Sequence, residues 1–203
     1  PCVTFTADAP QSFAMSQAIG TLEYSLNDGE WKELGTNIVT FGGDNGNLRL
    51  RGKYKYGTNG VSTIRFGNVT PVSCSGDIRT LLDYENYTTV SSRSAKFSYL
   101  FRDCYQLISP PELPATDLTS KCYYNMFYGC SNLINVPKLP ATTLVSECYY
   151  GMFEGCSSLT EAPELPATTL ASNCYERMFY GCSSLTETPK LPATNLRSGC
   201  YIR

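Results

Sequence analysis

The chain has 203 residues, a formal net charge of −2, 42% hydrophobic residues and 17% charged residues. This near-neutral balance gives no reason to expect nucleic acid or an anionic membrane as a partner, and no apolar run approaches the ~18 residues of a transmembrane helix. Histidine is absent, which excludes Ser/His/Asp and Cys/His catalytic arrangements and His-based zinc sites.

The first third of the chain predicts a small antiparallel β-sandwich over residues 1–74. Its sequence alternates apolar and polar residues in short runs, and Gly-rich turn signals such as Asn27-Asp28-Gly29 separate them. Strands at this spacing are typical of a sandwich. We expect strands over residues 3–7, 22–26, 37–41, 48–56 and 61–66.

A repeat with a period of 26 residues fills the remainder of the chain. The copies that begin at Cys122, Cys148 and Cys174 read CYYNMFYGC, CYYGMFEGC and CYERMFYGC. Residues 75–103 align at the same shift, with Phe101 on the Phe127 position, so we interpret them as a degenerate N-terminal capping rung. Identical apolar residues one period apart are expected to stack into core rows.

Each 26-residue rung is expected to contain a short strand in its Leu-Pro-Leu half and one or two helical turns in its CYxxMF half. The glycine after that half, as at Gly129, suits the end of a helix. The predicted fold class is therefore α+β: an N-terminal antiparallel β-sandwich followed by a short leucine-rich-repeat solenoid of 26-residue rungs over residues 75–203.

The repeat resembles the BspA-like leucine-rich-repeat proteins, a Bacteroides-type cell-surface group. The F-x-G-C-S-S-L unit at residues 153–159 and 179–185 carries the resemblance, and the segment LEYSLNDGEWKEL is similar to the β-domain often placed before such repeats. The resemblance implies export, display at the cell surface or outer membrane, and binding or adhesion. It implies no particular ligand.

Eight of the ten cysteines recur at two positions of the repeat, and Cys2 and Cys74 lie outside it. Their spacings do not match a C-x-x-C metal site, and eight equivalent copies argue against a single nucleophile. Buried free thiols that act as small core residues are the favoured interpretation, with disulfides within the repeats as the alternative. A bridge between Cys2 and Cys74 is a separate, open question.

Residues that vary between copies are the candidates for binding specificity, because constant ones are needed for packing. Tyrosine offers a large amphipathic contact area at low entropic cost. No catalytic, cofactor-binding or metal-binding residue is expected. The candidate binding residues are Tyr124, Tyr128, Tyr150, Glu154, Arg177 and Tyr180.

These observations predict a non-enzymatic recognition or adhesion protein that presents its repeat surface to a host or bacterial surface protein or to a glycan. The alternatives are a structural spacer that displays another domain and a carbohydrate-binding module centred on the β-domain, which would use Trp31. We also expect the C-terminal rung to offer an edge for self-association. The start at Pro1 is interpreted as that of a mature or trimmed chain.

Overall fold

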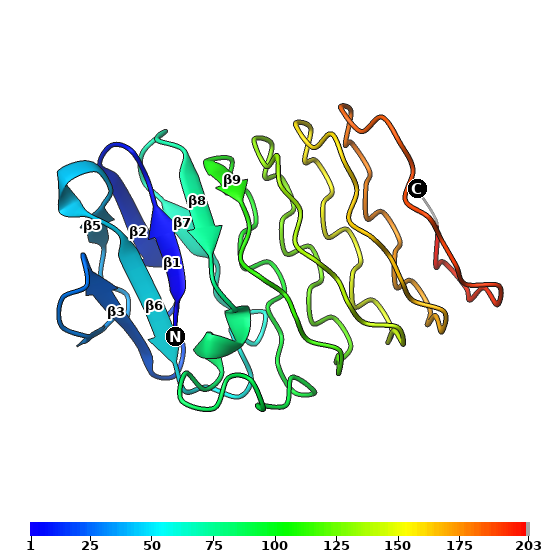
Figure 1. Ribbon diagram of the computed structural model, residues 1–203, viewed down its shortest axis with the longest axis horizontal. Helices are drawn as coiled ribbons and strands as arrows, with labels where there is room; N and C mark the ends of the chain where they lie inside the picture. The colour runs from blue at the N-terminus through cyan, green and yellow to red at the C-terminus, as the bar shows by residue number, and fades with distance from the viewer. Residues whose placement is uncertain (202–203) are drawn as a thin grey trace.

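The computed structural model describes residues 1–201, so Ile202 and Arg203 of the predicted C-terminal rung lie outside the described residues. Within residues 1–201 the regular elements are short strands and two 3-10 turns, η1 (Gly43–Asn45) and η2 (Ile78–Leu81), and there is no α-helix. Figure 1 shows the sheets at one end and a stack of coils that continues to the other end. The strands are β1 (Val3–Thr6), β2 (Gln11–Met15), β3 (Leu22–Leu26), β4 (Lys32–Glu33), β5 (Val39–Phe41), β6 (Leu48–Gly52), β7 (Ile64–Phe66), β8 (Val72–Ser75) and β9 (Leu107–Ser109).

The larger sheet has six strands in the order β4-β3-β6-β1-β8-β9. Neighbours within it are antiparallel except β8 and β9, which are parallel. Its strands alternate buried and outward residues, as in β6, where Leu48 and Leu50 are buried. The turn after β3 places Asn27 and Asp28 at positive φ, the geometry of a tight hairpin.

The smaller sheet has the order β5-β2-β7 and packs on the larger one through aromatic rings. The ring centroid of Phe5 in β1 lies 5.2 Å from that of Phe13 in β2 and 6.1 Å from that of Phe66 in β7. Gln11 is a buried polar residue here, and its Nε2 donates hydrogen bonds to the carbonyls of Asn68 and Thr70. The Gln11 side chain therefore supplies hydrogen-bond donors to backbone carbonyls of the loop that follows β7.

The parallel pair of β8 and β9 joins the sheet to the first copy of the repeat. β8 contains both Cys74 and Ser75, the residues on either side of the predicted domain boundary. The division into residues 1–74 and 75–203 stays a prediction.

The copies of the repeat form coils that stack one on the next, visible in Figure 1 from green to red. Within each coil we call residues 97–103, 121–129, 147–155 and 173–181 the turn runs. The backbone N–H of Tyr123 donates to the carbonyl of Cys148 at 3.0 Å, and that of Phe127 donates to the carbonyl of Met152 at 2.9 Å. Hydrogen bonds from one turn run to the residue 25 positions later thus hold each coil to the next.

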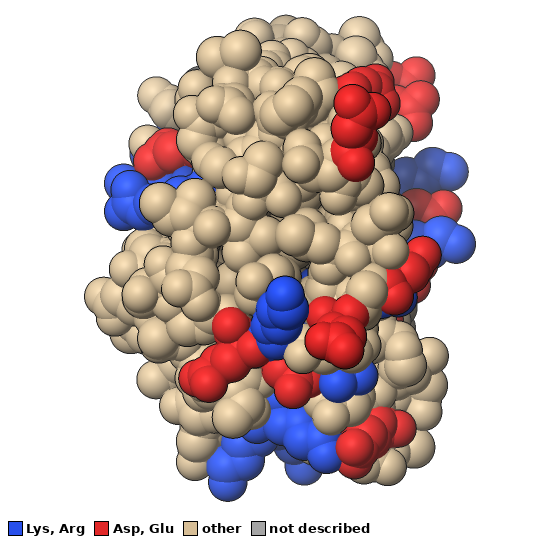
Figure 2. Space-filling model, turned by 90° about the vertical axis from the view of Figure 1, so that its left-hand side faces the viewer, with Lys and Arg blue, Asp and Glu red and all other residues tan. Residues whose placement is uncertain are grey.

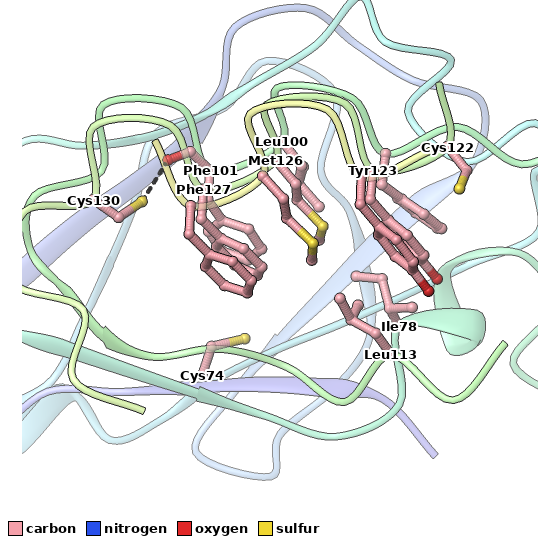
Figure 3. Close-up of a cluster of buried hydrophobic side chains, with 14 of the residues drawn as sticks. Cys74, Ile78, Leu100, Phe101, Leu113, Cys122, Tyr123, Met126, Phe127 and Cys130 are labelled. Atoms are coloured by element: carbon pink, nitrogen blue, oxygen red, sulfur yellow. Dashed lines mark hydrogen bonds between the residues drawn. The ribbon is translucent and has the colours of Figure 1, made fainter. Parts of the chain in front are cut away.

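Constant residues of the repeat stack directly in the core. The rings of Phe127 and Phe153 lie 5.6 Å apart and within 6° of parallel, and those of Tyr123 and Tyr149 lie 5.9 Å apart and within 4°. Figure 3 shows these columns with the buried thiol of Cys130, whose Sγ donates to the carbonyl of Phe101. A single coil could not bury such a column alone.

The α+β prediction with a leucine-rich-repeat solenoid is wrong. Among residues 1–201 the chain is built from two open sheets and turns, and after β9 there is neither a regular strand nor a helix. The expected helical turns are absent because φ is positive at every fourth residue of a turn run, for example +61° at Lys121, +48° at Asn125 and +73° at Gly129. An α-helix needs every residue in the right-handed region, so it cannot propagate through these positions.

The backbone of a turn run divides its hydrogen bonds between two directions. The N–H groups of Lys121, Tyr123 and Asn125 donate to the following coil, whereas those of the residues between them donate to the carbonyl three positions earlier in the chain. One such local bond runs from the N–H of Met126 to the carbonyl of Tyr123 at 3.2 Å. This alternation satisfies the backbone without helix or strand.

Candidate interaction surface

One side of the turn runs carries the residues that differ between copies. In the run 121–129 two buried residues alternate with two outward ones, as Met126 and Phe127 are buried while Tyr124 and Tyr128 are only partly covered. The outward positions of successive coils adjoin because the coils stack. We call this surface the tyrosine face, and it consists of Tyr99, Arg102, Tyr124, Tyr128, Tyr150, Glu154, Arg177 and Tyr180.

Three tyrosines of the face form a continuous row. The rings of Tyr124 and Tyr150 are stacked, 4.6 Å apart and within 5° of parallel, and Tyr99 meets Tyr124 edge-on at 5.5 Å. Burial and the neighbouring Tyr99 and Tyr150 raise the pKa of Tyr124 to about 12. Because the stacked rings of Tyr124 and Tyr150 each cover one face of the other, this pair offers a ligand fewer free ring faces than two separate tyrosines would.

Cations lie over the tyrosine rings. The guanidinium of Arg102 is 5.5 Å from the ring centroid of Tyr99 and 5.3 Å from that of Tyr128. The guanidinium of Arg177 is 4.3 Å from the ring centroid of Tyr180. Such contacts contribute roughly 0.5–1 kcal/mol at exposed sites. They therefore hold the tyrosine rings in one orientation and keep a positive charge beside each ring.

The predicted binding residues Glu154 and Arg177 contact each other. Nη2 of Arg177 donates to Oε1 of Glu154 at 2.5 Å, and Nε donates to Oε2 at 2.9 Å. Glu154 is buried, and its carboxylate raises the pKa of Arg177 through this hydrogen-bonded pair. Glu154 therefore organises the face, while Tyr180, which is 53% exposed, remains accessible.

The structure adds Tyr99 and Arg102 to the six predicted residues. Both come from the capping copy, where the repeat is degenerate. A signal was present in the sequence, because Arg102 is one period of 26 residues before Tyr128 and Tyr99 is one period before Asn125.

All ten cysteines are free thiols, Cys2 and Cys74 included. Burial raises the pKa of Cys104 and of Cys148 to about 12 and that of Cys182 to about 11. A neutral thiol is a poor nucleophile and a poor metal ligand. Within residues 1–201, no group of three or more His, Cys, Asp or Glu side chains could hold a metal ion.

Trp31 lies at the sheet end of the molecule beneath two arginines. The guanidinium of Arg51 is 4.0 Å from its ring centroid and that of Arg49 is 5.1 Å away. Arg49 also pairs with Asp28 at 2.8 Å, and Arg51 with Glu23 at 2.7 Å. Figure 2 views this end, where basic and acidic side chains intermingle in the lower half rather than forming a field of one sign.

A membrane-crossing helix, long and apolar enough for the purpose, does not occur within residues 1–201. Comparison of the whole chain with known proteins gives no match to a family model, to a curated protein or to a solved structure.

Proposed function

We propose that the chain is a non-enzymatic recognition protein that binds a surface protein or glycan through its tyrosine face. The observation that carries the proposal is the aligned row of Tyr99, Tyr124 and Tyr150, which a rigid stack of coils holds in place. Tyrosine-rich surfaces suit recognition because each ring loses little conformational freedom on binding.

Two further features support recognition. The stack gives the face a fixed geometry, since backbone hydrogen bonds and core columns join each coil to the next. The face also carries cations beside its rings, so it can contact both apolar and acidic groups. Repeat proteins commonly use such extended surfaces for binding. Export and display at a bacterial surface belong to the same proposal, and they rest on the sequence resemblance alone.

The carbohydrate-binding alternative centred on Trp31 receives less support from the geometry. A sugar ring stacks on an exposed aromatic face, and Arg51 lies 4.0 Å from the centroid of this indole. A ligand would have to displace an arginine that also pairs with Glu23.

The test is binding of the labelled chain to protein and glycan arrays. The variant Tyr128→Ala/Tyr180→Ala removes two partly exposed rings from the face. Tyr56→Ala is the matched control, because Tyr56 is 40% exposed and lies outside the face. We expect the double variant to lose at least about tenfold in affinity, as truncation of interface tyrosines commonly does, with no loss in the control. A well-folded wild-type chain that binds nothing on either array, as a spacer would, overturns the proposal.

A further inference from the structure

A cleft of about 660 Å³ lies where the small sheet meets the first coil. One wall consists of residues of β2 and β7, among them Ser12, Arg65 and Phe66, and the other wall is the segment 102–106. Ligands often bind at such junctions, where apolar walls converge with a few polar groups.

The outer edge of β7 offers a backbone donor to this cleft. β2 and β7 are antiparallel, and bonds from Ser16 N–H to the Thr63 carbonyl and from Gly67 N–H to the Ser12 carbonyl fix which pairs are hydrogen-bonded. Phe66 belongs to the other set, whose N–H and C=O point away from β2. Nε2 of Gln106 reaches the Phe66 carbonyl from that side at 3.5 Å, and the Phe66 N–H has no acceptor within residues 1–201.

Two cationic side chains line the same cleft. Arg65 is exposed and makes no ion pair or side-chain hydrogen bond within the described chain. Arg102 lies 3.4 Å from the carboxylate of Asp103, but both side chains are at least half exposed, and exposed pairs of this kind contribute little. The cleft therefore presents more positive than negative charge.

Arg102 also connects the cleft to the tyrosine face, because it lies over the rings of Tyr99 and Tyr128. An extended ligand on that face could thus reach the cleft. The stacked rings of Tyr124 and Tyr150 each cover one face of the other and so offer a sugar less free ring face, whereas their edges and hydroxyl groups suit the backbone and side chains of a peptide.

We propose that this cleft binds a carboxylate of a peptide segment from a protein partner, held by Arg65, Arg102 and the N–H of Phe66. This inference rests on the proposed recognition function and names the class of ligand. Charge-assisted hydrogen bonds from a guanidinium to a carboxylate are among the stronger polar contacts in proteins.

The test is titration of the ¹⁵N-labelled chain with N-acetylglutamate N-methylamide, followed through the amide resonance of Phe66. The uncharged probe is the corresponding glutamine derivative, and glucuronate represents an acidic sugar. We expect only the acidic peptide probe to shift the Phe66 resonance appreciably, with an affinity that falls as salt is added. Equal binding of the glutamine probe, no shift at Phe66, or tighter binding of glucuronate overturns the inference.

Three variants sharpen the test. Arg65→Gln should weaken binding by about tenfold, the effect of losing one charge-assisted contact. Asp103→Asn should strengthen it, because the cleft loses its own carboxylate. Arg93→Gln changes an exposed arginine elsewhere on the capping copy and should have no effect. If an array partner is lost with Tyr128→Ala/Tyr180→Ala but unaffected by Arg65→Gln, recognition stands and the carboxylate site does not.

Discussion

The buried carboxylate of Glu154 receives both of its hydrogen bonds from one guanidinium, that of Arg177 in the next coil. The two residues come from different rows of the repeat. Their pairing links two coils at the surface in the same way that the aromatic columns link them in the core.

Replacing Arg177 with Met should destabilise the chain by about 1–3 kcal/mol, because it leaves a buried carboxylate without its donors. The Glu154→Gln/Arg177→Met double variant should recover part of that loss, since an uncharged amide costs less to leave unpaired. Urea unfolding of the wild type and both variants measures the difference. A double variant less stable than Arg177→Met would contradict this role for the pair.

Gly151→Ala should destabilise the chain by more than the same change at a positive-φ glycine with open space around it. Gly151 has φ of +54°, and an added Cβ would lie 2.0 Å from Oδ1 of Asn125. Gly35→Ala is the matched control, because Gly35 has φ of +53° with open space around the new methyl group. Both variants should lose roughly 1–2 kcal/mol to backbone strain, and Gly151→Ala should lose more.

Thermal unfolding of the two glycine variants gives the comparison. Adding Asn125→Gly to Gly151→Ala should restore part of the stability, because glycine removes the opposing Oδ1 and accepts the positive φ at position 125. An equal loss of stability in Gly151→Ala and Gly35→Ala would show that the Asn125 side chain moves aside without an energetic penalty.

Stability should fall as the pH rises above about 9. Burial raises the pKa of Cys182 from 9.0 to about 11 and that of Cys104 to about 12, so the unfolded chain releases these protons first. Between about pH 9 and pH 12 the unfolded state binds fewer protons than the folded state, and the free energy of unfolding decreases. Urea unfolding at stepwise higher pH measures this slope, and Cys104→Ala should make it shallower. Constant stability between about pH 9 and pH 11 would rule the explanation out.

Only one thiol should react readily in the folded chain. Cys2 is partly exposed, whereas the other nine cysteines are buried. A thiol-alkylating reagent at neutral pH should therefore add one group quickly and the others at the rate of unfolding, as followed by intact mass. Cys2→Ser should remove the fast phase. After unfolding without a reductant, fewer than ten additions to the wild-type chain would reveal a disulfide.

The stacking of the repeat was predictable, whereas its backbone conformation was not. Identity at a shift of 26 residues indicates that Phe127 lies against Phe153, whatever path the chain takes between them. The helix prediction failed because buried pairs at Cys122 and Tyr123 and then at Met126 and Phe127 recur every four residues. Over only nine residues, a burial pattern that repeats every four residues cannot be distinguished from the 3.6-residue period of an amphipathic helix. Asn125 and Gly129, both tolerant of positive φ, were the available signal.

Comparison of the repeat copies predicted part of the candidate surface. Comparing copies aligns residues one period apart, and it placed Tyr124 beside Tyr150. It could not bring Glu154 and Arg177 together, since they are 23 residues apart and meet only through the geometry of the coils. The N–H of Phe66 at the outer edge of β7 could not be predicted either. β2, which pairs with β7, begins with the buried polar residue Gln11, and this interrupts the apolar–polar alternation by which a strand is recognised.

The hydrogen bonds that the turn runs make between coils all run in one sense, from the N–H groups of one coil to the carbonyls of the next, and this affects how two molecules can associate. An ordinary strand edge displays donors and acceptors together, so it can pair with a copy of itself. A turn run sends the N–H groups of Tyr123, Asn125 and Phe127 forward and receives the preceding coil at its rear carbonyls. Two such forward edges brought face to face would set donor against donor. Within the turn runs, a forward edge therefore complements the rear of another coil and not a second forward edge. The other half of each coil also donates backward, as from the N–H of Ser158 to the carbonyl of Ser131.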